Sequence, residues 1–128
     1  NNGDGMILGD TSLLIDRLQG KIEAEKPEEH GNLATCFPVQ CELYKGTRIA
    51  RNTEKGEKQV RKLLDTMDEL EAGRESAEKF AELRQKYPGT NELDLMIAGI
   101  CISNGASILS QDEDFHEIEE LEVRTVDK

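Results

Sequence analysis

Residues 6–18 read Met-Ile-Leu-Gly-Asp-Thr-Ser-Leu-Leu-Ile-Asp-Arg-Leu, a short apolar run followed at once by apolar residues at helical spacing. Met6-Ile7-Leu8 is typical of a buried strand that ends at Gly9-Asp10. Thr11 or Ser12 is suited to cap the helix that follows, which is predicted to extend to Gly20. A strand that passes directly into a helix is the unit from which α/β folds are built.

The rest of the chain continues this alternation. Two further short apolar segments and one alternating segment predict strands at 33–37, 107–110 and 121–126. A helix is predicted after Pro38, running through Glu42 to about Ala50. Helical spacing predicts further helices over 60–70, over 77–83 after Gly73, and over 93–101, with a turn at Pro88-Gly89 and an end at Asn104-Gly105. The polar segment 21–32 is expected to mix helix and loop. The order indicates an α/β fold with a mainly parallel sheet.

Length and composition bound the possibilities. The chain has 128 residues, so we expect a single domain over residues 6–128, preceded by an N-terminal extension or cloning scar at residues 1–5. The formal net charge of −11 argues by itself against a nucleic-acid partner. Three cysteines do not make a disulfide framework, and they favour a reducing, cytoplasmic compartment. There is no apolar run of the ~20 residues that a membrane span requires.

Four acids stand out from the 27 in the chain by their positions. Asp10 and Asp112 directly follow predicted strands, where parallel sheets collect their ligands. Asp94 opens a helix among apolar neighbours, and Glu42 lies in a similarly apolar setting early in its helix. Each has an ordinary structural explanation: a helix start for Asp10 and Asp112, an N-cap for Asp94, and an amphipathic boundary for Glu42.

Taken together, these four acids indicate a metal site. Carboxylates without a convergent His, Lys or Cys suit hard cations such as Mg²⁺ or Mn²⁺. Such an ion activates water, neutralises the charge that develops on a phosphodiester, and reduces the repulsion between an acidic protein and RNA. The residues alone therefore predict an acidic metal site with phosphoryl chemistry.

The chain resembles PIN-domain proteins over nearly its whole length. Residues 7–16 look like the opening strand and helix of that family, and residues 41–46, Cys-Glu-Leu-Tyr-Lys-Gly, look like its Glu-Leu-hydrophobic-x-Gly helix. Residues 92–99, Glu-Leu-Asp-Leu-Met-Ile-Ala-Gly, are similar to its third acidic motif, and residues 105–115 to its Gly-Ala-strand-Thr-x-Asp-x-Asp-Phe segment. The length and the closing Leu-Glu-Val segment are most like the VapC-type toxins of toxin–antitoxin pairs.

This resemblance implies a three-layer α/β/α sandwich and a Mg²⁺- or Mn²⁺-dependent endoribonuclease. It also implies a homodimer and a basic antitoxin protein whose tail occupies the acidic groove. The implied catalytic residues are four acids: Asp10, Glu42, Asp94 and Asp112. The implied metal ligands are Asp10, Asp94 and Asp112, with Asp114 as an accessory acid. The resemblance also implies that Thr11 or Ser12 supplies a hydroxyl that supports Asp10. The sequence departs from the family pattern at Gly9, Val39 and Ser110, without loss of an acid.

The stretch from Lys45 to Lys62 carries seven basic residues and only two acids. We predict that Lys45, Arg48 and Arg51 position the RNA backbone, because they follow Glu42 on the same helix and just beyond it. The alternative is that they solvate a helix or pair with Glu54 and Glu57. Two other functions remain open: an RNA-processing PIN nuclease and a catalytically silent PIN-like binding module. A receiver domain is disfavoured, because we find no phospho-accepting Asp with a late Lys.

Overall fold

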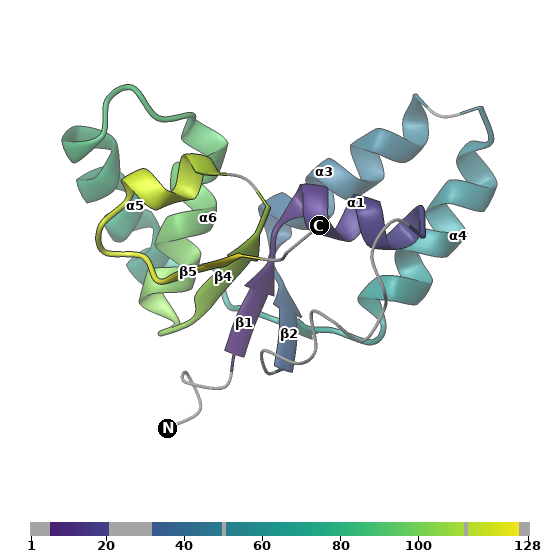
Figure 1. Cartoon of the computed structure of the whole chain (residues 1–128), viewed down its shortest axis with the longest axis horizontal. Coiled ribbons are helices and arrows are strands. Elements are labelled where there is room, and N and C mark those ends of the chain that lie inside the picture. Colours follow the sequence, from purple (N-terminus) through teal and green to yellow (C-terminus); the bar gives the residue numbers. More distant parts are fainter. Residues whose placement is uncertain (1–5, 21–31, 50, 112, 126–128) are drawn as a thin grey trace.

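The computed structural model describes residues 6–20, 32–49, 51–111 and 113–125. Its centre is a five-stranded sheet in the order β3-β2-β1-β4-β5, and every neighbouring pair is parallel (Figure 1). The strands are β1 (Met6–Gly9), β2 (Asn32–Thr35), β3 (Asp68–Glu69), β4 (Ser107–Ser110) and β5 (Val123–Thr125). Because all strands are parallel, their carboxyl ends share one edge of the sheet.

Helices cover both faces of this sheet and make a three-layer α/β/α sandwich, which confirms the predicted fold class (Figure 1). The first group, to the right in Figure 1, contains α1 (Thr11–Leu18), α3 (Phe37–Arg48) and α4 (Thr53–Leu64). The second group, to the left, contains α5 (Arg74–Lys86), α6 (Glu92–Ser103) and the short 3₁₀ helix η2 (Glu113–Glu117). Right-handed crossovers from a central β1 require this division of helices between the two faces.

The core lies between the central strands and the two helical layers. Every residue of β4 is buried, and Ile7 and Leu8 of β1 are inaccessible to solvent. A parallel strand covered on both faces has no polar side to expose, so its sequence reads as a continuous apolar run. This explains why β1 and β4 were recognisable from the sequence.

Several helix and strand boundaries differ from expectation: α1 ends at Leu18 rather than at Gly20, and β5 covers only Val123–Thr125. Asp10, rather than Thr11 or Ser12, is the N-cap of α1. The second strand ends at Thr35, and α3 begins at Phe37 with Pro38 in its first turn. The predicted helix over 60–70 ends at Leu64.

A strand replaces the end of that predicted helix. β3, Asp68–Glu69, is a two-residue edge strand, and the backbone N–H of Leu70 extends its ladder by donating to the Thr35 carbonyl at 2.8 Å. Both residues of β3 are exposed and charged, so no apolar signal marks them. Charges on an edge strand also disfavour pairing with another sheet.

The helix predicted over 93–101 is present, but it is not amphipathic. The helix lies between the sheet and α5, so its buried residues extend around it rather than along one face. They are Leu95, Ile97, Ala98, Gly99, Ile100 and Cys101. The mixed helix and loop predicted for 21–32 lies almost entirely outside the described residues.

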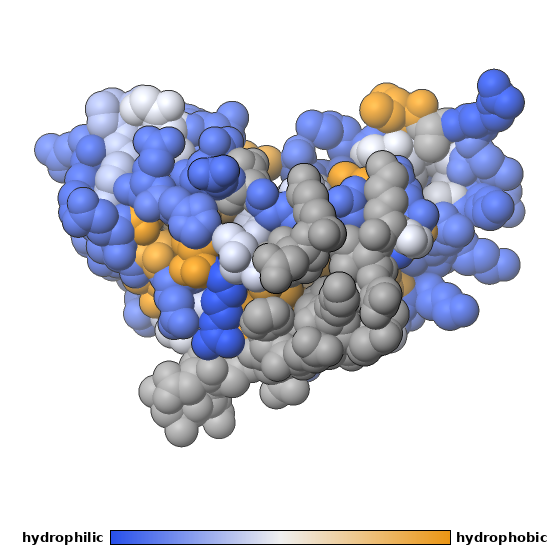
Figure 2. Space-filling model, in the orientation of Figure 1, coloured by the Kyte–Doolittle hydropathy of each residue, from blue (hydrophilic) through white to orange (hydrophobic). Residues whose placement is uncertain are grey.

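The carboxyl edge of the sheet opens between the two helical groups. Figure 2 shows the molecule hollowed there, between the lobe that carries α5 and α6 and the lobe that carries α3 and α4. Of the helices that the structure describes, none has the length and apolar character needed to span a lipid bilayer.

Candidate active site

Asp10 lies at the carboxyl end of β1, between β2 and β4, and is only 6% exposed. Its Oδ1 accepts a hydrogen bond from the backbone N–H of Thr11 at 2.8 Å. Its Oδ2 accepts from the hydroxyls of Ser110 at 2.8 Å and Ser12 at 3.3 Å. Three donors therefore fix the orientation of a buried carboxylate.

Ser110 is the site residue that sequence reasoning did not assign. The predicted supporting hydroxyl was that of Thr11 or Ser12; Ser12 does donate its hydroxyl, whereas Thr11 contributes its backbone N–H. The shorter hydroxyl bond comes from Ser110, at the end of the neighbouring strand β4. A hydroxyl residue at the end of the segment before Asp112 was the available signal, since the family pattern places Thr there.

Two buried thiols lie near Asp10: Cys36 is the N-cap residue of α3, and Cys101 belongs to α6. Burial raises the pKa of Cys36 to about 11, and the charges of Glu69 and Asp10 contribute to the rise. Burial also raises the pKa of Cys101 well above its ordinary value, with Cys36 and Asp10 contributing. A raised pKa disfavours the thiolate form, so neither cysteine is expected to be a reactive thiol in the metal-free protein.

Asp94 lies in the first turn of α6 and is half-buried. The N-cap of this helix is Asn91, whose Oδ1 accepts from the backbone N–H of Leu93 at 2.9 Å and of Asp94 at 3.3 Å. The N-cap explanation for Asp94 is therefore wrong. A carboxylate in this turn is favoured by the partial positive charge of the helix N-terminus.

Glu42 lies on the second turn of α3, and its carboxylate is bound to Lys45 at 2.9 Å. The side chain of Glu42 is 31% exposed and that of Lys45 is 71% exposed. An i,i+3 pair at this exposure is a weak interaction that a ligand can replace. Helices α3 and α6 contact each other, so Glu42 and Asp94 belong to packed neighbouring elements.

The last two acids follow β4. Asp112 lies outside the described residues, and Asp114 is an exposed residue of η2. Within the described ranges, no three His, Cys, Asp or Glu side chains group closely enough to hold a metal ion. The structure thus fixes Asp10 in detail, and the convergence of all four acids stays a prediction.

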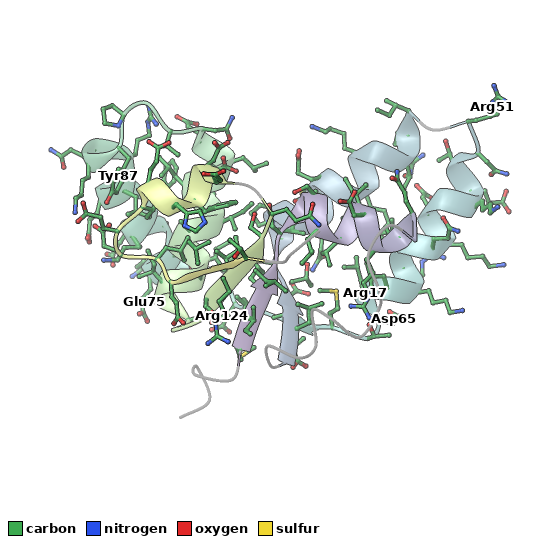
Figure 3. All side chains as sticks on the ribbon, in the orientation of Figure 1. Arg17, Arg51, Asp65, Glu75, Tyr87 and Arg124 are labelled. Carbon is green, nitrogen blue, oxygen red and sulfur yellow. The ribbon has the colours of Figure 1, made fainter. Side chains whose placement is uncertain are left out.

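The three predicted RNA-binding cations have different surroundings. Lys45 pairs with Glu42, whereas Arg48 forms an ion pair with Glu57 of α4 at 2.5 Å. Figure 3 places Arg51 at the outer tip of the α3–α4 pair, away from the strand ends. Lys45 is therefore the predicted cation that lies beside an acid of the quartet.

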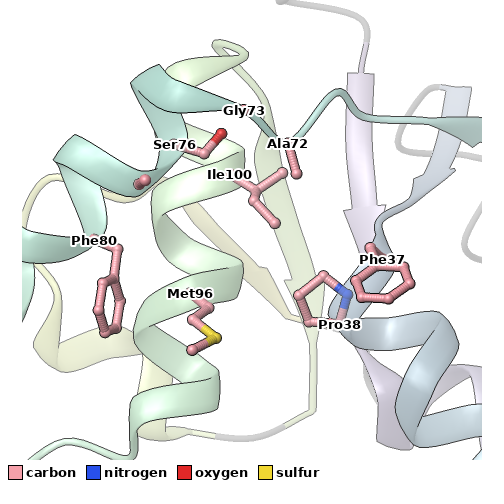
Figure 4. A pocket seen from close by; sticks show the side chains of 9 residues that line it. Phe37, Pro38, Ala72, Gly73, Ser76, Phe80, Met96 and Ile100 are labelled. Atoms are coloured by element: carbon pink, nitrogen blue, oxygen red, sulfur yellow. The ribbon is translucent and has the colours of Figure 1, made fainter.

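Two surface grooves lie apart from these acids. One has a volume of about 270 Å³ and separates the start of α3, at Phe37 and Pro38, from α5 and α6 (Figure 4). Phe37 is 63% exposed at its rim, and Met96 is 40% exposed. The other, of about 320 Å³, lies among α1, α3 and α4 and is lined by Ile15, Leu18, Gln19, Leu43, Gly46, Thr47, Gly56, Gln59 and Val60.

The strand order makes the junction of β1 and β4 the switch point of the sheet, where chain connections leave in opposite directions. A parallel α/β/α domain with a buried, hydrogen-bonded aspartate there belongs to the class that binds ligands at the carboxyl edge of its sheet. The chain belongs to the PIN-domain family, whose family model matches residues 7–121. This confirms the family predicted from the four sequence motifs.

Solved structures show the same fold. A chain of VapBC2 from Rickettsia felis, crystallised with a DNA fragment from the promoter, superposes with a TM-score of 0.86 at 17% identity, covering 95% of this chain and 99% of that one. A chain of VapBC-1 from nontypeable Haemophilus influenzae superposes with a TM-score of 0.83 at 18% identity, covering 94% of this chain and 97% of that one. A chain of a toxin–antitoxin complex from Klebsiella pneumoniae superposes with a TM-score of 0.75 at 23% identity, covering 94% of this chain and 96% of that one. No curated protein sequence matches the chain.

Proposed function

We propose that this protein is a metal-dependent endoribonuclease and the toxin of a toxin–antitoxin pair. The observation that carries the proposal is Asp10, a carboxylate held by three donors at the switch point of the sheet. Such a group costs stability when buried unless its hydrogen bonds and a ligand compensate it. Membership of the PIN-domain family and a fold shared with toxin–antitoxin complexes support a nuclease of this kind.

The donor set fits Mg²⁺ or Mn²⁺. The proposed ligands are carboxylate oxygen atoms, which these hard cations prefer to the sulfur of the two nearby thiols. Hydrogen bonds to a ligating carboxylate, like those of Ser12 and Ser110 to Asp10, orient a metal ligand. Because the described acids alone do not form a cluster, the proposed site depends on Asp112.

In this proposal Asp10, Asp94 and Asp112 hold the metal, with Asp114 as an accessory acid. Glu42 supplies a further ligand or holds the attacking water. The bound ion would activate that water and stabilise charge on the phosphodiester. Asp10 cannot rotate freely because of its three donors, so its contribution is a fixed oxygen position.

RNA reaches the site through local attraction rather than through net charge. Lys45 lies beside Glu42 and becomes available for a phosphate when a metal or RNA displaces their ion pair. Arg48 lies farther along α3 and must give up Glu57 to bind RNA. Arg51, at the tip of the α3–α4 pair, would contact only an RNA that extends along this lobe.

The grooves support the proposed partners. The apolar groove beside Phe37 and Met96 fits a second copy of the chain, because burying two exposed large apolar side chains favours association. The groove among α1, α3 and α4 fits an apolar segment of an antitoxin, whose basic tail would then reach the acids. We place this pair in the cytoplasm, where three free thiols remain reduced.

The principal alternative is a catalytically silent PIN module. The ordinary role of Asp10 as an N-cap favours it, because a capping carboxylate needs no metal ion. The two functions are separated by RNA cleavage in Mn²⁺. The test variant is Asp10→Asn, and Asp16→Asn is the matched control, because it removes an acid from the same helix, away from the strand end.

If the protein is the proposed nuclease, wild type and Asp16→Asn cleave RNA at the same rate, and Asp10→Asn cleaves at the background rate. Asp10→Asn also unfolds at the same temperature as wild type or at a higher one. Cleavage must also stop on chelation and return with Mg²⁺ or Mn²⁺, and Ca²⁺ in excess must inhibit it. Equal cleavage by Asp10→Asn and wild type would refute the assignment. Tight RNA binding without cleavage by any variant would favour the silent module.

A further inference from the structure

Arg84 lies in the last turn of α5 and reaches the turn that leads into α6. Its guanidinium donates to two backbone carbonyls, through one terminal nitrogen to Thr90 at 2.9 Å and through the other to Pro88 at 2.8 Å. Its Nε lies 3.9 Å from the carboxylate of Glu92, the first residue of α6. One planar group therefore spans both sides of Gly89.

Few other contacts restrain the middle of this turn. A Cβ at Gly89 would meet no atom within 4 Å, so packing does not confine the loop there. The other backbone bond inside the turn, from the Thr90 N–H to the Tyr87 carbonyl, is long at 3.2 Å. The two bonds from Arg84 are therefore a principal restraint on the carbonyls of residues 88 and 90.

The conformation of this turn determines where the capping residue of α6 lies. The first N–H groups of a helix have no partner inside the helix and depend on the residues before it. Asn91 supplies that cap by accepting from Leu93 and Asp94, and it directly follows Thr90, whose carbonyl is bound to Arg84. The body of α6 is fixed by the core, but the turn that carries Asp94 is only half-buried.

We propose that Arg84 is a positioning residue that fixes Asp94 for metal binding by bridging the Pro88 and Thr90 carbonyls. This inference rests on the proposed function, in which Asp94 is a metal ligand. Two donors in a rigid fork restrain the direction of both carbonyls, and a lysine ammonium cannot reproduce that geometry. The side chain of Arg84 is 35% exposed, so its bonds contribute little to global stability while they restrict the local backbone.

The test measures Mn²⁺ binding by electron paramagnetic resonance on the metal-free full chain, with no RNA present. Arg84→Lys keeps the charge and loses the fork, and Arg84→Gln loses both. Lys86→Gln is the matched control: it removes a positive charge from the same helix end, where Lys86 pairs with Glu120 and lies over the Tyr87 ring rather than bonding to the Pro88 and Thr90 carbonyls. Asp94→Asn reports on the proposed ligand itself, and thermal unfolding is recorded for each variant.

We expect both Arg84 variants to bind Mn²⁺ roughly 10-fold more weakly, at the lower end of the effect of residues that orient metal ligands. Lys86→Gln should bind like wild type, and Asp94→Asn should lose the site. If Asp94→Asn weakens binding and both Arg84 variants bind like wild type, Arg84 has no positioning role although the proposed function stands. If only Arg84→Gln is weakened, charge rather than the fork is responsible and the inference is wrong. If Asp94→Asn binds like wild type, the proposed function itself fails.

Discussion

Ser110→Ala tests whether Asp10 depends on a donor from another strand. The change removes a buried hydroxyl that donates to the Asp10 carboxylate at 2.8 Å. A hydrogen bond to a charged group contributes about 1.5–3 kcal/mol, against about 1 kcal/mol for a neutral one. We therefore expect Ser110→Ala to lower the free energy of unfolding by roughly 2 kcal/mol, and by roughly 1 kcal/mol in an Asp10→Asn background.

The assay is urea unfolding of the metal-free protein at pH 7, with Ser107→Ala as the matched control. Ser107 lies on the same strand and is also buried, but among the described residues its hydroxyl has no carboxylate partner. Its replacement should be close to neutral, because it removes no bond to a charged group. Equal stability of Ser110→Ala and Ser107→Ala, or an equal cost of Ser110→Ala in both backgrounds, would refute the reasoning.

Three further outcomes follow from other contacts. Gly99→Ala should destabilise the fold by about 1–3 kcal/mol in urea unfolding, because its Cβ would lie 3.0 Å from the backbone oxygen of Ser76; a neutral effect would mean that α5 and α6 separate at no cost. The hydrogen bond from the Tyr87 hydroxyl lowers the pKa of Glu120 in the folded protein. Ionised Glu120 therefore stabilises the fold at pH values above its unfolded-state pKa, and this stabilisation is lost as the pH falls through the folded-state pKa. Glu120→Gln should therefore flatten the loss of stability between about pH 5 and 3; an unchanged pH dependence would contradict this. Iodoacetamide should alkylate Cys41 in the native protein and the two buried cysteines only after unfolding, as read by mass spectrometry; labelling of all three at one rate would contradict the structure.

The strands that carry the site could be predicted because they are apolar. Residues 7–9 and 107–110 are buried, and the apolar residues Ile7, Leu8, Ile108 and Leu109 at the centres of these segments mark the strands. β3 could not be predicted, because its two charged residues form an exposed edge that pairs only through backbone groups. Local periodicity contains no information about such a strand.

The details around Asp10 were harder to predict for two different physical reasons. Asp10, Thr11 and Ser12 are three adjacent residues that all cap helices well, so composition alone did not decide which one does so. The bond from Ser110 joins strands that are neighbours only in the folded sheet. The ion pair of Arg48 with Glu57 likewise follows from the packing of α3 on α4, although pairing with that glutamate was one of the two alternatives considered.

The link between Asp10 and Ser110 also bears on when the protein becomes active during its synthesis. The donor lies 100 residues after the acid, so it leaves the ribosome long after the first strand and helix. Closing so long a segment is costly before the two strands pair, so assembly of the acidic edge is a late folding event. A nascent chain, or one cleaved between its two lobes, would therefore carry Asp10 without its Ser110 donor and lack the finished site. In a nuclease of the proposed kind, the order of folding itself would protect the cell until synthesis of the β4 strand is complete.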